Sequence, residues 1–217
     1  MKLAVSTINF PVTTLGFGRR LGIWTQGCSI RCPGCVSRDT WESSPDSLVE
    51  INEIMRSCEH WLEGADGVTI SGGEPFDQPD ALLELVSRIR AIHHGDLLVF
   101  SGYALEFLQA NHTGILEQID VLVAGPYEAG SSQDLFLRGS DNQVIELLTD
   151  LASERYAEEI ERTNHERQRR MNVLVEGDKA WLAGIPAQED MGKLRRLMAR
   201  KGYAVQTSDQ AFYRIKG

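Results

Sequence analysis

Three cysteines lie within eight residues of one another, at Cys28, Cys32 and Cys35. Their spacing is C-x3-C-x2-C, and Gly27 and Gly34 permit the sharp backbone turns that so short a loop requires. Thiolates are soft ligands that suit zinc or an iron-sulfur cluster. The spacing therefore predicts a metal centre in this loop.

The number of cysteines bears on which metal is bound. A structural zinc site takes four protein ligands, and the fourth cysteine, Cys58, falls on the apolar stripe of a predicted helix, where a small buried residue is expected. None of the five histidines stands at zinc-finger spacing. A 4Fe-4S cluster held by three cysteines leaves one iron open to a substrate or cofactor. The spacing favours the cluster and leaves zinc as an alternative.

Glycine follows each of four predicted buried strands. The strands are Leu21 to Thr25, Gly67 to Ser71, Leu97 to Ser101 and Asp120 to Ala124, and the residues at their ends are Gly27, Gly72-Gly73-Glu74-Pro75, Ser101-Gly102-Tyr103 and Gly125-Pro126. Glycine lets a ligand approach the main chain closely, and the carboxyl ends of parallel strands are where sites form. These segments predict a pocket lined by backbone beside the cysteine loop.

Helical patterns alternate with these strands, which predicts an α/β fold with a largely parallel sheet. The first predicted helix begins at Ser44-Pro45 and has an apolar stripe of Leu48, Ile51, Met55, Cys58 and Leu62. The second begins after Pro79 and has the apolar residues Leu82, Leu85, Val86 and Ile89. The third runs from Ala104 to Ala110.

The composition changes beyond Asn142. We expect a charged helix over Thr149 to Arg170, a hairpin of Asn172 to Glu176 with Lys179 to Ala183, a helix from Gln188 to Lys201, and strands at Tyr203 to Gln206 and Phe212 to Ile215. The chain would then consist of a core at 1–148, a charged helical connector at 149–170 and a small ββαββ-like α+β module at 171–217.

The net charge of −9 argues against a nucleic-acid-binding protein, although residues 191–217 are basic. The chain has no apolar run near the ~20 residues that cross a bilayer, and its first ten residues do not resemble a signal peptide. We therefore expect a cytoplasmic protein with reduced thiols and no membrane partner.

The cysteine loop and Gly72-Gly73-Glu74-Pro75 together resemble the radical S-adenosylmethionine (radical SAM) superfamily. Further segments resemble the glycyl radical activating enzymes of anaerobic ribonucleotide reductase: Asp39-Thr40-Trp41, Ser101-Gly102-Tyr103, Asp120 to Pro126 and Arg138 to Gln143. The resemblance covers roughly residues 8 to 148. This chain departs from the family pattern at Gly16-Phe17-Gly18 and in the long segment Val144 to Gly217.

The resemblance implies a partial (β/α) barrel and an oxidoreductase that cleaves S-adenosylmethionine (SAM) reductively to form a 5'-deoxyadenosyl radical. Cys28, Cys32 and Cys35 would be the ligands of a 4Fe-4S cluster. The SAM pocket would be formed by Gly72, Gly73, Glu74, Pro75, Ser101, Gly102, Tyr103, Ser140, Asn142 and Gln143. A flavodoxin or ferredoxin would donate one electron.

Three functions remain open at this point. The radical would activate a glycyl radical protein, as the resemblance implies, or the same core would modify a peptide or small molecule. A third function, of another class, is an electron-transfer or structural zinc module. Gly72 to Pro75 argues against that third function, because an electron carrier has no need of a pocket lined by glycine.

Overall fold

The computed structural model describes residues 1–160, 162–163 and 171–210. Its main feature is one mixed sheet of seven strands in the order β3-β1-β2-β4-β5-β6-β7. These strands are β1 (Lys2–Val12), β2 (Arg20–Thr25), β3 (Leu48–Glu50), β4 (Gly67–Gly72), β5 (Asp96–Ser101), β6 (Val121–Ala124) and β7 (Val144–Leu147). The four central strands β2, β4, β5 and β6 are parallel, as expected from the alternation of strands and helices.

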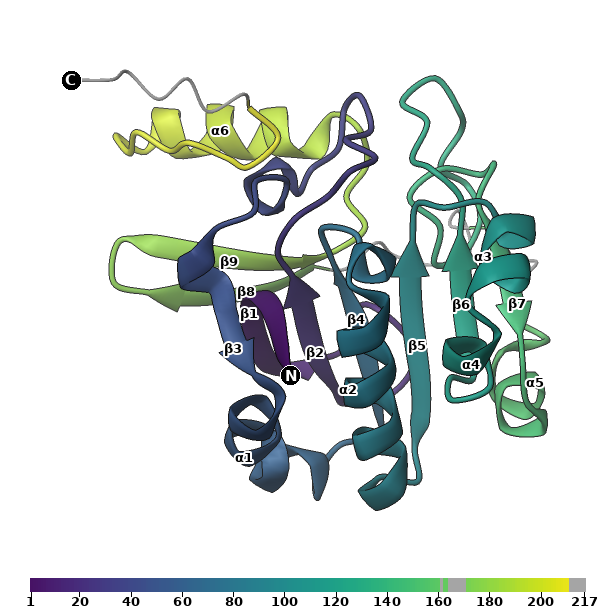
Figure 1. Ribbon diagram of the computed structural model, residues 1–217. Coiled ribbons are helices and arrows are strands. Elements are labelled where there is room, and N and C mark those ends of the chain that lie inside the picture. The colour runs from purple at the N-terminus through teal and green to yellow at the C-terminus, as the bar shows by residue number, and fades with distance from the viewer. Residues whose placement is uncertain (161, 164–170, 211–217) are drawn as a thin grey trace.

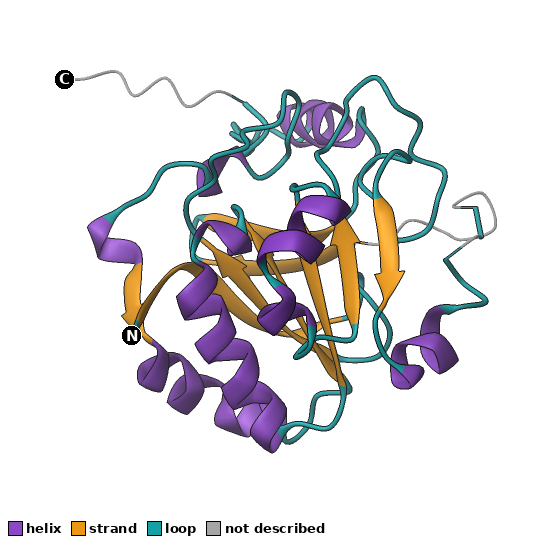
Figure 2. Ribbon diagram, turned by 45° about the vertical axis from the view of Figure 1, so that its right-hand side comes forward, coloured by secondary structure: helices purple, strands orange, loops and turns teal. Residues whose placement is uncertain are grey.

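The helices that precede β6 in the chain cover one face of this sheet, as Figures 1 and 2 show, whereas the helix after β7 packs with residues of the opposite face. In chain order, the helical elements are η1 (Arg38–Thr40), η2 (Pro45–Ser47), α1 (Ile51–Leu62), η3 (Pro75–Asp77), α2 (Pro79–Ile92), α3 (Leu105–Asn111), α4 (Thr113–Leu116), α5 (Asp150–Tyr156) and α6 (Asp190–Arg200). Apolar side chains at helical spacing form the contact between α2 and the sheet, because Leu82, Leu85 and Ile89 are all fully buried.

The first predicted helix was wrong in its starting point. Ser44 caps only the short η2, and Leu48 to Glu50 form strand β3, which pairs with Lys2 to Ala4 at the edge of the sheet. The helix α1 begins at Ile51, and Cys58 lies buried on its apolar stripe, as predicted. The hydrogen bonds offered by the edge of β1 outweigh the local helix signal at Ser44-Pro45.

The predicted helix over Thr149 to Arg170 was also too long. The helix α5 ends at Tyr156, and residues 157–160 form a turn. Ala152 and Tyr156 are fully buried against the sheet, so the helical part of this segment belongs to the core. Residues 161 and 164–170 lie outside the described part of the chain.

The C-terminal part contains a separate hairpin of β8 (Met171–Glu176) and β9 (Lys179–Gly184), as predicted around Gly177. The helix α6 follows within the range expected for it. Tyr203 to Gln206 form no strand, which corrects that prediction, and Phe212 to Ile215 lie outside the described residues. Figure 1 shows the hairpin behind β1 and β2, on the face that α1 and α2 leave open.

Candidate functional site

The loop that carries the three cysteines begins directly after β2. Gly27 and Gly34 have φ angles of 97° and 82°, which confirms that both turns need glycine. Two hydrogen bonds close the loop onto η1, from the Gly27 amide to the Thr40 carbonyl (2.8 Å) and from the Cys28 amide to the Trp41 carbonyl (3.0 Å). The backbone therefore fixes the first cysteine from both sides.

The three thiols lie close enough to affect one another. Burial raises the pKa of Cys28, Cys32 and Cys35, and the charge of Cys28 contributes to the raised pKa of the other two. Within the described ranges, no three His, Cys, Asp or Glu side chains converge where a single metal ion would be held. A 4Fe-4S cluster is ligated at three separate irons, so its cysteines need not meet at one point. Three partly exposed thiols in one loop fit that group.

The segment Gly72 to Glu74 packs against the start of this loop. The Gly73 amide donates to the Thr25 carbonyl (2.9 Å) and the Glu74 amide to the Gly27 carbonyl (2.8 Å). A Cβ atom on Gly73 would stand 2.0 Å from the Gly27 carbonyl oxygen, so only glycine permits this approach. The end of β4 and the cysteine loop are therefore one connected unit, as the positions of their motifs predicted.

Glu74 joins the end of β4 to the end of β5. Its carboxylate is almost fully buried and accepts from the Gly102 amide (2.7 Å), the Phe76 amide (3.0 Å) and the Ser101 hydroxyl (2.9 Å). Burial raises the pKa of Glu74 from its usual 4.5 to about 7, although these three hydrogen bonds act in the opposite direction. The Glu74 side chain therefore positions Ser101 and Gly102.

Asp77 connects the cysteine loop to the end of β5, and the sequence analysis did not single it out. Its carboxylate accepts from the Ser29 amide (2.7 Å) and the Ser29 hydroxyl (2.8 Å), and from the Tyr103 hydroxyl (2.7 Å). Ile30 adds an apolar contact, since a Cβ on Gly102 would meet its Cδ1 at 2.7 Å. The one available sequence signal was an acidic residue two positions after Pro75.

Ser140, Asn142 and Gln143 lie in the loop that follows β6. The Ser140 hydroxyl accepts from the Glu128 amide (3.0 Å), and the amide side chains of Asn142 and Gln143 donate to the carbonyls of Pro126 (2.9 Å) and Gly125 (2.7 Å). The side chains of these three residues thus stabilise the loop in which they lie. The same loop borders the cysteines, because a Cβ on Gly34 would meet Ala129 at 3.0 Å.

Comparison with known proteins gives a family for this chain. The family described as "4Fe-4S single cluster domain" matches residues 14–146. The anaerobic ribonucleoside-triphosphate reductase-activating protein of Escherichia coli K12 is 34% identical over 145 residues, which are 63% of this chain and 94% of that protein. The protein of the same name from Enterobacteria phage T4 is 30% identical, over 62% of this chain and 88% of its own length.

This chain belongs to the family of anaerobic ribonucleoside-triphosphate reductase-activating proteins. The resemblance drawn from the motifs is thereby confirmed. The chain is a radical SAM enzyme of the activating type, and its cofactors are a 4Fe-4S cluster and SAM.

Among solved structures, QueE from Escherichia coli aligns with 47% of this chain and 53% of its own, at a TM-score of 0.42 and 19% sequence identity. Within the described residues, no helix is both long and apolar enough to span a membrane.

Proposed function

We propose that this chain forms a glycyl radical in a partner protein of the reductase type, by abstracting a hydrogen atom from a glycine Cα. The observation that carries this proposal is the connection of three thiols in one loop to the glycine-lined end of β4. The curated relatives are named as activators of an anaerobic ribonucleoside-triphosphate reductase, which supports a glycyl radical protein as the partner.

Cys28, Cys32 and Cys35 are the proposed cluster ligands. They lie in the same loop and are half-buried, whereas Cys58 is fully buried on the apolar face of α1. The Gly27 amide donates to the Thr40 carbonyl and the Cys28 amide donates to the Trp41 carbonyl, so main-chain hydrogen bonds fix the start of the loop. When bound, the reduced cluster and SAM supply a 5'-deoxyadenosyl radical, with methionine as the other product.

The proposed SAM pocket lies along the ends of β4 and β5. Gly72 and Gly73 bring the end of β4 against the cysteine loop, where the methionyl end would bind, and Pro75 begins the η3 turn that carries Asp77. Glu74 accepts hydrogen bonds from Ser101 and Gly102, and Asp77 accepts one from Tyr103. The segment after β4 therefore fixes the end of β5. Ser140, Asn142 and Gln143 would contribute by shaping the loop on the far side.

The remaining parts of the proposal concern the chain as a whole. We propose that the sheet is a partial (β/α) barrel of radical SAM type within 1–148, joined to an accessory module at 171–217 by the segment 149–170, whose helix α5 packs on the core. A flavodoxin or ferredoxin is the proposed one-electron donor. The proposed location is the cytoplasm, which the reduced cysteines support.

Anaerobic reconstitution tests the cluster assignment. We expect about four irons per chain, and we expect dithionite-reduced protein to convert SAM to methionine and 5'-deoxyadenosine. The Cys32→Ala variant should lose both iron and SAM cleavage, whereas Cys58→Ala, the matched control, should keep both. Loss of the cluster in Cys58→Ala, or one zinc per chain in the wild type, would contradict the assignment.

The partner is tested separately with a glycyl radical protein encoded beside this chain. Electron paramagnetic resonance should show a glycyl radical doublet in that protein only when SAM, reductant and cluster-loaded enzyme are all present. Cleavage of SAM without that doublet would retain the radical SAM chemistry and reject the proposed substrate.

A further inference from the structure

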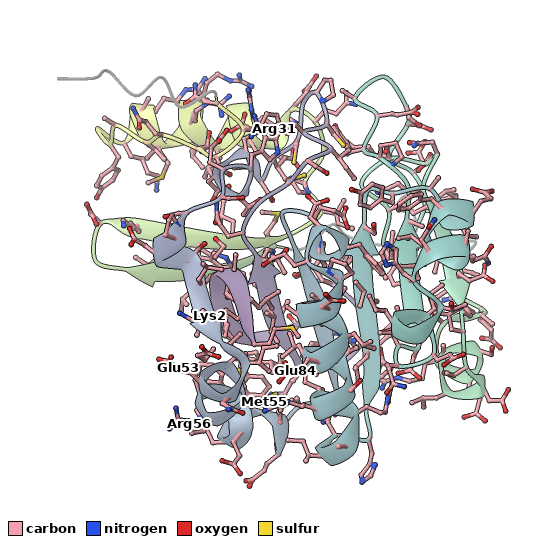
Figure 3. All side chains as sticks on the ribbon, viewed as in Figure 1. Lys2, Arg31, Glu53, Met55, Arg56 and Glu84 are labelled. Carbon is pink, nitrogen blue, oxygen red and sulfur yellow. The ribbon has the colours of Figure 1, made fainter. Side chains whose placement is uncertain are left out.

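The C-terminal segment Thr207 to Asp209 lies against the residues that follow the third cysteine. The Ser208 hydroxyl donates to the Val36 carbonyl, and the Arg38 guanidinium donates to the Asp209 carbonyl (3.4 Å). These partners are separated by 172 and 171 positions in the chain. Figure 1 shows α6 at the end of the molecule where the cysteine loop lies, and Figure 3 labels Arg31 of that loop at the same end.

A second set of contacts fixes this segment to α6. One guanidinium nitrogen of Arg195 lies 2.7 Å and 2.8 Å from the two carboxylate oxygens of Asp209, and it also donates to the Thr207 hydroxyl. Burial alone would raise the pKa of Asp209, but the hydrogen bonds from Arg195 and Thr207 and the charge of Arg195 hold it below its usual value. The segment Thr207 to Asp209 is therefore bound to α6 by a charged, hydrogen-bonded pair.

The contacts continue from Arg38 to the cysteines. The Arg38 guanidinium carbon stands 4.8 Å from the centre of the Trp41 ring. The Trp41 carbonyl accepts from the Cys28 amide (3.0 Å), and the Ser37 amide donates to the Cys35 sulfur (3.4 Å). The segment from Ser37 to Trp41, which includes Arg38, thus contacts two of the three cysteines.

We propose that Ser208 and Asp209 are positioning residues for the cysteine loop. Together with Thr207 and Arg195 they form what we call the C-terminal clasp, which holds the segment from Val36 to Trp41 and thereby orients the Cys35 thiol. The match to the family ends at residue 146, so the clasp is a feature of this chain outside the matched region. Its relation to the cluster rests on the proposed function, but the contacts themselves do not.

The first test uses the full, cluster-free, reduced chain and measures alkylation of each cysteine by iodoacetamide, located by mass spectrometry. We expect Ser208→Ala and Asp209→Ala to speed alkylation of Cys35 about fivefold, the factor that corresponds to one lost hydrogen bond. Cys58, which is buried in α1, should react at its wild-type rate. The control Lys193→Gln, an exposed position on the same helix, should change neither rate.

The second test asks for rescue. Ser208→Thr keeps the hydroxyl, and exchanging the charges in an Arg195→Asp, Asp209→Arg double variant keeps the pair, so both should return Cys35 to near its wild-type reactivity. In cluster-loaded protein, Ser208→Ala should alter the electron paramagnetic resonance spectrum of the reduced cluster, and Ser208→Thr should restore it.

The outcomes separate this proposal from the proposed function. An unchanged Cys35 rate in both alanine variants would overturn the clasp, as would an equal rise at Cys58, which would indicate general loosening of the fold. Failure of the wild type to bind iron would instead reject the cluster assignment, and the alkylation rates would still decide whether the clasp positions Cys35.

Discussion

Glu74 is a buried carboxylate whose ionisation should affect stability. Because burial raises its pKa from 4.5 to about 7, the folded chain binds a proton that the unfolded chain releases between these two values. The contribution of Glu74 to stability is therefore fully present below about pH 4.5 and declines as the pH rises to 7. The decline has an upper bound of about 3 kcal/mol.

Urea unfolding of the cluster-free chain across this pH range measures the effect. The control is Glu74→Gln, which has no proton to lose and should lack this part of the pH dependence. It should also be less stable than the wild type by about 1–3 kcal/mol, because the amide nitrogen of glutamine replaces one of the two oxygens that accept from the amides of Phe76 and Gly102. Equal pH dependence in both proteins would show that residue 74 does not titrate in this window.

Asp77 should matter for the cofactor site although it does not belong to the recognised motifs. Asp77→Ala removes the acceptor for the Ser29 amide, next to the first cysteine, and for the Tyr103 hydroxyl. Loss of a residue that orients a metal ligand typically costs 10–100-fold in affinity or activity. We expect a loss of about that size in the rate of 5'-deoxyadenosine formation and faster loss of iron to a chelator.

The matched control is Asp80→Ala, an exposed carboxylate in the first turn of α2. A wild-type rate of SAM cleavage in Asp77→Ala, or an equal loss in both variants, would argue against a specific role for Asp77.

These residues show how far the sequence predicts the site. The cysteine spacing and Gly72-Gly73 could be recognised in the sequence, because a short loop and a close backbone approach each require particular residue types. The role of Asp77 was not legible, since its partners stand 48 and 26 positions away and only the folded chain brings them together.

At the scale of elements, the central strands could be predicted and the edges could not. β6 is a continuous apolar run, β2 contains one from Leu21 to Trp24, and both strands are buried on both faces, which gives a clear signal. β3 is three residues long and its burial pattern is mixed, and β7 carries a charged residue at Glu146. Such strands form because a neighbouring strand offers hydrogen bonds, and that information is absent from the local sequence.

A buried polar network links four elements at the end of the sheet opposite the cysteines. Arg20 and Asp96 are fully buried and paired at 2.8 Å, and Arg20 also donates to the Thr69 hydroxyl (2.6 Å). The Tyr156 hydroxyl of α5 donates to Asp96 (2.8 Å). The network therefore ties α5 to β2, β4 and β5.

Replacing Arg20 with methionine should leave the Asp96 carboxylate without its fully buried cation. Removing one partner of a buried ion pair costs about 3–5 kcal/mol, and we expect a loss of that size in chemical unfolding. The adjacent Arg19→Met is the control, because Arg19 is exposed and should change stability little. A loss below ~1 kcal/mol in Arg20→Met would show that Arg155, whose guanidinium also pairs with Asp96 (2.5 Å), compensates for it.

At the scale of the whole molecule, the C-terminal part touches the core at several places, including hydrogen bonds from Gln188 to Gln133 and Ala129. The hairpin packs on the open face of the sheet, where the rings of Trp24 and Trp181 meet edge to face at 4.6 Å and Ala183 is buried. The Asn172 side chain accepts from the Thr13 amide (2.8 Å). The C-terminal clasp forms another of these contacts. The sequence indicated the hairpin and the helix, but gave no sign of where they would lie.

A chain that ends at Arg170 tests the proposed division of the molecule. The seven-stranded sheet needs no strand from the hairpin, and all the proposed ligands precede residue 144. We therefore expect this shortened chain to fold, bind iron and cleave SAM, but to form no radical in its partner. Exposure of Trp24 should lower its stability by about 3 kcal/mol, as for removal of a large aromatic contact from a core. A full-length Trp181→Ala variant loses the packing on Trp24 and keeps the clasp, so it separates the effects of these two contacts on stability. An insoluble or iron-free shortened chain would instead show that residues 171–217 are part of the core.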